Sequence, residues 1–276
     1  MRQIRIRKDL EIVRTLVFLL LISLCLSGSA SAMKLKVMTY NILYGAGVEP
    51  SDREVSESST NGKCMGDRLD RVIKVIKHVD PDVLGIEEAN SWNKNDQAIA
   101  KKVASELGMN YYLAVSGRSG FHVAVYSKLP IASAKGFPDE FTRSALQAEL
   151  TLPDGRPFHV FVQHFNLRRN PEGQLEEIRC LASKMRPYAF DLGVMMGDAN
   201  FSYGKHESQS KALKASGFVI APQIGLLIDQ IWTTRPLEGR VLDSPKIPTE
   251  LIDGTSDHMP TVVIVDIPPA KASNCN

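Results

Sequence analysis

The chain has 276 residues, with 33 basic and 31 acidic side chains, so its formal net charge is +2 at pH 7. This excess comes from the first 32 residues, because the remaining 244 contain 28 basic and 29 acidic side chains, a formal charge of −1. Residues 33–276 are enough for one large domain with a substantial core. Their near-neutral charge gives no electrostatic case for nucleic-acid binding, which normally rests on clustered lysine and arginine.

Residues 1–32 resemble a secretory signal. Five basic residues lie in the first 14 positions, an apolar stretch runs from Leu16 to Leu26, and small residues follow at Ala30-Ser31-Ala32. This stretch is shorter than the roughly 20 apolar residues that a membrane-spanning helix needs. We therefore expect cleavage after Ala32 and a secreted or periplasmic protein, with an uncleaved membrane anchor as the alternative.

Three cysteines remain after the signal, at positions 64, 180 and 275. Export permits disulfides, and we expect Cys64 to pair with Cys180 because Cys275 lies in the polar tail "KASNCN". None of the three has the spacing of metal-binding cysteines.

The secondary-structure signals alternate between helices and strands. Residues 49–63 are polar and predict an exposed, mobile loop. Apolar residues at 69, 72, 73, 76 and 79 predict an amphipathic helix, and further helices are expected at 97–107, 174–188 and 207–216. Strands are expected at 35–41, 82–88, 123–127, 145–152, 158–164, 192–198, 226–233 and 260–267, with a hairpin turn at "LPDG", 152–155. This order predicts two packed sheets with helices outside.

Five of these strands carry an apolar row with one polar residue on the same face, because side chains two apart share a face. The polar residues are Asn41, Glu88, His164, Asp198 and Asp229. Burying such groups unpaired costs several kcal/mol, so they should meet one another or reach a cleft at the sheet edge. A cluster of this kind suits a hard cation, because Mg²⁺ prefers oxygen ligands.

Each residue also has an ordinary explanation when taken alone. His164 has the alternative of a hydrogen-bonded core histidine, and Asn41 that of a turn former. Near the C-terminus, Ser256-Asp257-His258 precedes the last strand, and a histidine near a carboxylate is typical of a general base. The alternative there is a surface histidine in a loop. A serine hydrolase is disfavoured because no G-x-S-x-G motif occurs.

Seven segments together resemble the endonuclease/exonuclease/phosphatase superfamily of metal-dependent phosphoesterases, in the family's order. They are "MTYNI" (38–42), "PDVLGIEEAN" (81–90), "VAVYSKLPI" (123–131), "VFVQHFNL" (160–167), "MGDANF" (196–201), "IDQIW" (228–232) and "SDHMP" (256–260). The resemblance implies an α+β fold, a four-layer αββα sandwich of two mostly antiparallel sheets. It places the active site at one sheet edge.

The resemblance also implies a metal site. Glu88 matches the main Mg²⁺ ligand, with Mn²⁺ or Ca²⁺ as alternative ions, Asn41 matches the asparagine beside it, and Asp257 matches a further metal contact. The family often has glutamine before its metal-binding glutamate, where this chain has Glu87. This departure leaves open which acid binds metal, although the strand register favours Glu88.

The remaining matches concern catalysis. His258 matches the general base and Asp229 the carboxylate that orients it. Asp198 and Asn200 match the pair that positions the attacking water and the phosphate. Two further residues complete the set: His164, which stabilises the phosphate or assists the leaving group, and Arg143, which contacts the phosphate.

These roles predict a secreted Mg²⁺-dependent enzyme that hydrolyses a phosphodiester by in-line attack of water, with an endonuclease-like activity first. A sphingomyelinase-like lipid phosphodiesterase and an inositol-phosphate or phosphoinositide phosphatase are the alternatives. A non-catalytic binding or accessory domain on the same fold is the alternative of another class. We expect a phosphoester substrate, nucleic acid or a phospholipid head group, and a monomer.

Overall fold

The computed structural model describes residues 33–59, 67–224 and 228–270, of which 33–268 form one compact unit. The predicted signal segment, Cys64 and Cys275 lie outside the described residues. Cys180 carries a free, half-buried thiol, which does not support the expected disulfide. Within the described ranges, no helix has the length and apolar character needed to cross a membrane.

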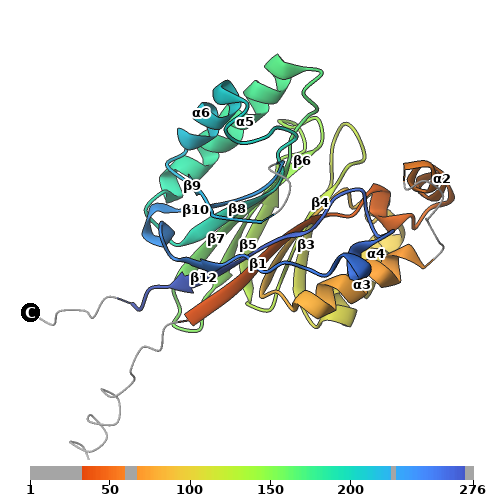
Figure 1. The fold of residues 1–276 in the computed structure, drawn as a ribbon, viewed down its shortest axis with the longest axis horizontal. Coiled ribbons are helices and arrows are strands. Elements are labelled where there is room, and N and C mark those ends of the chain that lie inside the picture. The colour runs from red at the N-terminus through yellow and green to blue at the C-terminus, as the bar shows by residue number, and fades with distance from the viewer. Residues whose placement is uncertain (1–32, 60–66, 225–227, 271–276) are drawn as a thin grey trace, which may run out of the picture. The chain divides into compact units, whose positions relative to one another are not determined.

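Two six-stranded sheets form the centre of this unit (Figure 1). The first has the order β11-β12-β1-β2-β4-β3, made of Val241–Asp243, Thr261–Ile267, Met33–Asn41, Val83–Glu87, Val123–Ser127 and Asn110–Ala114. The second has the order β5-β6-β7-β8-β10-β9, made of Ile131–Gly136, Ser144–Thr151, Pro157–His164, Gly193–Asp198, Asp229–Thr233 and Val219–Ile220. β1 pairs with β2, and β7 with β8, in parallel, whereas the other described pairs are antiparallel.

Helices cover the outer face of each sheet. In Figure 1, α3 and α4 lie on the first sheet, and α5 and α6 lie on the second. The helices are α2 (Pro50–Ser59), α3 (Arg68–Val79), α4 (Lys94–Leu107), α5 (Pro171–Met185), α6 (Glu207–Lys214) and α7 (Thr249–Ile252), with 3₁₀ turns at Tyr44–Ala46, Arg186–Tyr188 and Arg235–Leu237. The predicted α+β sandwich with helices outside is confirmed.

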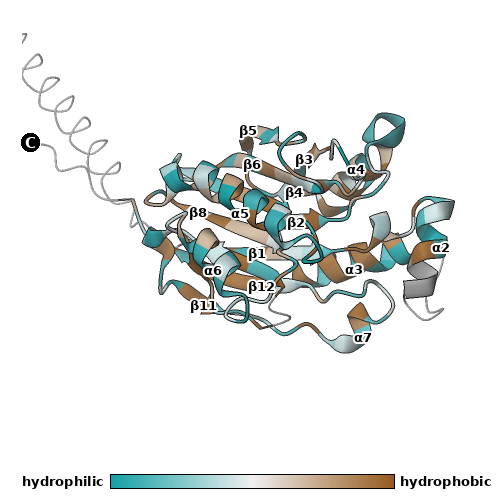
Figure 2. Cartoon of the chain, turned by 90° about the horizontal axis from the view of Figure 1, so that it is seen from above, coloured by the Kyte–Doolittle hydropathy of each residue, from teal (hydrophilic) through white to brown (hydrophobic). Residues whose placement is uncertain are grey.

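The hydrophobic core has three layers, and the apolar colour of Figure 2 lies mainly on the strands and on the inner faces of the helices. The middle layer contains side chains from both sheets, among them Val37, Val162, Met196 and Val263. The two outer layers join one sheet each to its helices. Burying both faces of each sheet in this way explains why the central strands β2, β4, β7, β8 and β10 are almost wholly buried, whereas the edge strands β5, β9 and β11 are partly exposed.

The prediction of a loop at residues 49–63 is wrong where the structure has α2. This helix follows Glu49, whose carbonyl accepts the N–H of Arg53. Asp52 accepts a hydrogen bond of 3.1 Å from Ser91, and Lys94 forms an ion pair with Glu49. These contacts with Ser91 and with Lys94 at the start of α4 stabilise a polar helix that the local sequence does not predict. Residues 60–63 of the predicted loop lie outside the described residues.

The other element boundaries differ by a few residues, and four short strands were not predicted. The helix expected at 174–188 begins at Pro171, after the capping side chain of Asn170, and ends in a 3₁₀ turn. The strand expected at 226–233 begins at Asp229, and residues 225–227 are not described. β3, β5, β9 and β11 are absent from the sequence prediction. The predicted hairpin at 152–155 is confirmed by the hydrogen bond from the N–H of Gly155 to the carbonyl of Leu152.

Four of the five polar residues lie on rows that face the middle core layer, as predicted. Those rows end in Asn41, His164 and Asp198 or begin with Asp229, and their apolar members belong to that layer. The row of Leu84 and Ile86 instead faces α3 and α4, so the expectation that Glu88 simply continues it into the site is wrong. Glu88 follows β2 with a φ of 58°, and this left-handed turn redirects the chain.

Gly197 gives a direct test of the close contact between β7 and β8. Its φ is 138°, and a Cβ atom there would lie 1.9 Å from the carbonyl oxygen of Gln163. We expect Gly197→Ala to lower the free energy of unfolding by at least about 3 kcal/mol, because strain and steric overlap act together. Gly155, with a φ of 84° and no neighbour within 4 Å, is the matched control. Gly155→Ala should cost only about 1 kcal/mol, and equal losses in urea denaturation would contradict the steric argument.

Candidate active site

The strand register brings the predicted residues to one edge of the two sheets. Asn41 pairs with Glu87 at the ends of the parallel strands β1 and β2. In the second sheet, His164 pairs with Asp198 at the ends of β7 and β8, and Asp229 pairs with Asp198 from β10. Because parallel strands end on the same side, polar residues separated by about 190 positions in the chain become neighbours.

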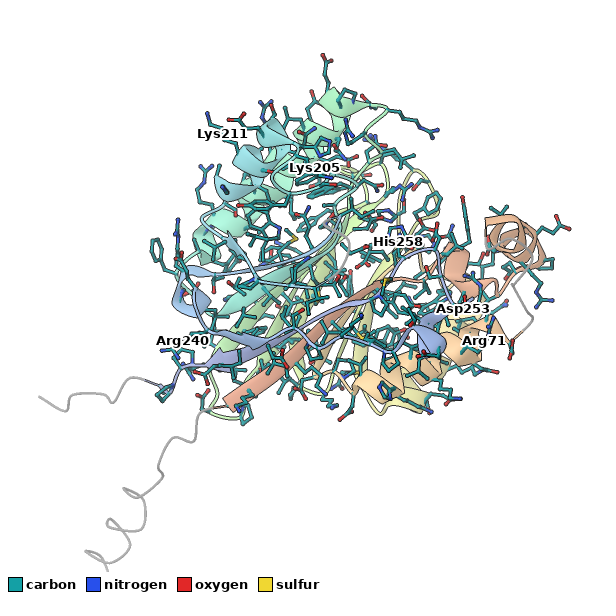
Figure 3. All side chains as sticks on the ribbon, viewed as in Figure 1. Arg71, Lys205, Lys211, Arg240, Asp253 and His258 are labelled. Carbon is teal, nitrogen blue, oxygen red and sulfur yellow. The ribbon has the colours of Figure 1, made fainter. Side chains whose placement is uncertain are left out.

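His258 and Asp229 form a hydrogen-bonded pair. The Nδ1 atom of His258 lies 2.9 Å from Oδ2 and 3.1 Å from Oδ1 of Asp229. Ser256 fixes the loop of His258, because its hydroxyl accepts the backbone N–H of His258 and donates to the carbonyl of Asn41. In the view of Figure 3, His258 lies between Lys205 on one side and Asp253 with Arg71 on the other.

Asp198 connects the histidine pair to the rest of the site. Its Oδ2 atom lies 3.1 Å from Nδ2 of Asn41, 3.2 Å from Nε2 of His164 and 3.8 Å from Nε2 of His258. The carboxylate is only 1% exposed. Residues from both sheets therefore converge on one buried carboxylate.

Glu88 reaches this group from the other side. One carboxylate oxygen accepts the backbone N–H of Tyr44, and the other lies 3.4 Å from Nδ2 of Asn41 and 3.4 Å from Nη1 of Arg143. The Asn41 amide nitrogen thus faces both Glu88 and Asp198, while its oxygen accepts the N–H of Leu43.

Arg143 lies between Glu88 and His164, just before β6. Its guanidinium contacts the His164 ring and stacks on Phe121, 4.6 Å from the ring centroid. Its side chain is 12% exposed, so most of the guanidinium is held by these contacts. The sequence motif around Arg143 does not predict this contact with Phe121.

Two predicted residues are less closely connected. Asn200, with a φ of 53°, donates its backbone N–H to Asp198 and its side-chain amide to the carbonyl of Phe165. Asp257 is exposed, and among the described residues its carboxylate accepts only a 3.4 Å hydrogen bond from the Ser256 hydroxyl. Its role as a further metal contact stays a prediction.

Glu87 is fully buried and faces the middle core layer. Thr39 donates a 2.7 Å hydrogen bond to one carboxyl oxygen, and the other has no hydrogen-bond partner among the described residues. Burial raises the pKa of Glu87 well above its usual value, and the charges of Asp229 and Asp198 raise it further. A buried carboxyl with a raised pKa therefore stands where the family often has a glutamine amide.

The two histidines are in opposite electrostatic environments. Burial would lower the pKa of His258, but the hydrogen bond and charge of Asp229, with the charges of Asp198 and Asp257, raise it to about 10. Burial lowers the pKa of His164, and Arg143 lowers it further. Burial would raise the pKa of Asp198, but contacts with both histidines and the N–H of Asn200 hold it below its usual value.

The donor set fits a divalent cation. Asp198, Asp229 and His258 each offer one ligand atom, and these atoms lie within 4.8 Å of one another. The Glu88 carboxylate, 7% exposed, lies next to this group through Asn41. Several buried carboxylate oxygens with few cationic partners form the environment that hard ions prefer.

Arg68 is a supporting residue that the sequence analysis missed. Its buried guanidinium donates to the carbonyls of Ile42, Leu43 and Thr255. It therefore ties the loop after β1 to the loop that carries His258. In the sequence, Arg68 is only a charged residue at the start of an amphipathic helix, and no pattern there predicts these contacts.

Comparison with known proteins identifies the class to which this fold and site belong. The family model described as endonuclease/exonuclease/phosphatase family matches residues 38–258. The chain belongs to this family, whose members are phosphoester hydrolases, and the prediction of such an enzyme is confirmed. Enzymes of the family are generally dependent on divalent metal ions.

Solved structures agree with the fold. The human nocturnin catalytic domain with bound sulfate is 16% identical, with a TM-score of 0.64 over 85% of this chain and 95% of that one. A mannosyl-6-phosphatase from Bacteroides thetaiotaomicron is 18% identical, with a TM-score of 0.60 over 84% and 99%. An AP endonuclease from Archaeoglobus fulgidus is 19% identical, with a TM-score of 0.59 over 84% and 100%. A search of curated proteins gave no significant match.

The His258–Asp229 pair can be tested by titration of the metal-free protein. We expect the wild-type imidazole to stay protonated at pH 8, because the neighbouring carboxylates raise its pKa to about 10. Asp229→Asn removes the closest of these charges, so the pKa should fall toward the ordinary value of about 6.5. NMR of labelled histidine measures both values, and an unchanged pKa in the variant would contradict the assignment.

Proposed function

We propose that this hydrolase cleaves a phosphodiester by in-line attack of water, with His258 as the general base. The observation that carries the proposal is the hydrogen-bonded His258–Asp229 pair, which faces Asp198 at the point where both sheets end. A base held by a carboxylate has a fixed ring orientation, and the carboxylate stabilises the imidazolium that forms. His258 must first release the proton that the neighbouring carboxylates hold in the metal-free protein, so activity should rise with pH toward the raised pKa of about 10.

We propose Mg²⁺ as the ion, with Glu88 and Asn41 as its ligands and Asp257 as a further contact. Mn²⁺ and Ca²⁺ are the alternative ions. When bound there, the ion offsets negative charge on the phosphoryl oxygens. The proposal is supported by the carboxylate oxygens of Glu88 and Asp198, which both lie near the Asn41 side chain; the ligand atom of Asn41 would be its Oδ1, which also accepts the N–H of Leu43.

Asp198 and the side chains around it have two further roles in the proposed mechanism: holding the attacking water and binding the phosphoryl group. Asp198 and Asn200 hold the attacking water, because the Asn200 backbone fixes one Asp198 oxygen and leaves the other toward His258. On the opposite side, Arg143 and His164 bind the phosphoryl oxygens or the leaving group. Such fixed positioning and charge account for most of the catalysis in phosphoryl transfer.

We propose nucleic acid as the first substrate to test. Arg168 and Arg169 follow His164 by four and five residues, and Lys205 follows Asp198 by seven. All three are exposed and form no ion pair with any described residue. This local charge supports a polyanionic substrate although the whole domain is near neutral. The structural neighbours do not distinguish between the candidate substrates, because they include both an endonuclease and a sugar phosphatase.

Loss of the general base gives the main test of the mechanism. We expect His258→Ala to reduce kcat on bis-p-nitrophenyl phosphate by about 10²–10⁴-fold, and EDTA to abolish wild-type turnover until Mg²⁺ is restored. His78, on the exposed face of α3, provides the matched control His78→Ala, which should keep wild-type rates. Full activity of His258→Ala, or turnover in EDTA, would overturn the proposal.

A substrate panel separates the alternatives. Plasmid DNA, RNA, sphingomyelin vesicles and phosphoinositides are each incubated with the wild type and with His258→Ala. Nuclease activity supports the first proposal, whereas activity on a lipid or inositol phosphate alone supports the corresponding alternative. Binding without turnover on every substrate would indicate an accessory domain.

We also propose that residues 1–32 direct export and are removed, which leaves one domain at residues 33–276. The proposal is supported by the basic start, the short apolar stretch from Leu16 to Leu26 and the small residues at 30–32. Expression of the full chain in a bacterial host should give exported protein whose N-terminal residue is Met33, as measured by intact mass. Retention of residues 1–32 in a membrane fraction would instead support an anchor.

A further inference from the structure

We propose that Gln174 and Glu177 are positioning residues for the active site, acting from α5 without contacting the reacting atoms. We call the two side chains the α5 clamp. They lie three residues apart on the buried face of the helix and contact the loops that carry Arg143 and Asn200 and the loop that follows His164. The inference rests on the proposed function of those three residues.

Glu177 joins two of the loops through backbone N–H groups. Its Oε1 atom accepts the N–H of Thr142 at 2.7 Å, directly before Arg143. Its Oε2 atom accepts the N–H of Asn166 at 2.8 Å, two residues after His164. Glu177 is 5% exposed, and charge-assisted hydrogen bonds of this length are roughly twice as strong as neutral ones. A third contact, from the Asn166 amide to the Thr142 hydroxyl, links the same loops.

Gln174 holds the third loop through backbone carbonyls. Its Nε2 atom donates to the carbonyl of Asn166 at 2.7 Å and lies 3.3 Å from the carbonyls of Ala199 and Asn200. Its own oxygen accepts from Gln209 of α6, so the side chain cannot turn freely. Gln174 thereby stabilises the turn at Asn200, which has a φ of 53° and needs outside support.

The helix provides a rigid base for both side chains. Asn170 caps its first turn by accepting the N–H of Gly173. Ile178, Leu181 and Met185 are fully buried in the layer between α5 and the second sheet. Because the clamp is on the same buried face, movement of α5 would have to break this packing. The three loops are therefore tied to a helix as well as to one another.

The hydrogen-bonding groups of Glu177 and Gln174 match the backbone groups that they contact. A carboxylate accepts two N–H groups, and an amide nitrogen donates to carbonyls, so each side chain is matched to the backbone groups it faces. Glu177→Gln would turn an NH₂ group toward one N–H donor. Gln174→Glu would place a carboxylate against three carbonyl oxygens. Each change mismatches a buried contact while keeping the side-chain volume.

The kinetic test compares Glu177→Gln with Glu176→Gln, its exposed neighbour on the same helix. We expect Glu177→Gln to lower kcat on bis-p-nitrophenyl phosphate by about 10- to 100-fold, with KM changed less than about threefold. The reason is that misplaced Arg143 and His164 lose contacts made in the transition state. Glu176→Gln should keep wild-type values, and Gln174→Glu provides a second clamp variant if the first folds poorly.

A double-mutant cycle separates positioning from general loss of structure. If Glu177 acts through Arg143, the loss in kcat for Glu177→Gln combined with Arg143→Lys should be smaller than the product of the single losses. Amide hydrogen exchange gives a readout without activity: Thr142 and Asn166 should exchange at least about tenfold faster in Glu177→Gln, while amides in the sheets away from α5 keep their wild-type rates, and Glu176→Gln should change neither.

The outcomes distinguish the two proposals. Multiplicative losses in the cycle, or unchanged exchange at Thr142 and Asn166, would overturn the clamp even in an active enzyme. A wild type that hydrolyses no phosphoester would overturn the proposed function, while the exchange measurement would still decide whether the clamp holds the loops.

Discussion

The buried carboxylate of Asp198 is the group on which the site depends. It ends β8, and it contacts Asn41 from the first sheet, His164 from the neighbouring strand and His258 from the loop before β12. A carboxylate removed from water is stable only when hydrogen-bond donors replace the lost solvent. The ends of β1 and β8 must therefore lie next to each other, because the hydrogen-bond donors to Asp198 come from both sheets. The same requirement explains the close backbone approach at Gly197, one residue earlier.

The sequence predicted this convergence well because it follows from strand periodicity. Asn41, His164, Asp198 and Asp229 lie on apolar rows with a period of two, and those rows face the layer between the sheets. Glu88 reaches the site by a route that the row argument did not predict, since its row faces the helices and a left-handed backbone turn redirects the chain. Periodicity contains no information about such a turn. The helix at 50–59 was missed for a related reason, because its support comes from residues 91 and 94.

The residues that the sequence left unassigned are those that act on backbone groups. Arg68, Gln174 and Glu177 bind carbonyls and N–H groups of the site loops, and none of them follows a motif that predicts this. Each lies on a helix whose apolar pattern is otherwise ordinary. Their partners are backbone atoms, which every residue has, so the pairing becomes visible only in three dimensions. The fold thus fixes the catalytic loops through helices on both sides of the sandwich.

The pairing of β1 with β12 has a consequence for when the enzyme becomes active. These two strands are the first and the last of the described domain, and they lie side by side from Met33 to Thr39. His258 lies in the loop just before β12, so the proposed general base reaches the site only when the C-terminal strand adds to the sheet. Contacts between such distant parts of a chain form late in folding. A chain that lacks β12 would therefore also lack the proposed general base, and hydrolysis would depend on folding of the C-terminal strand.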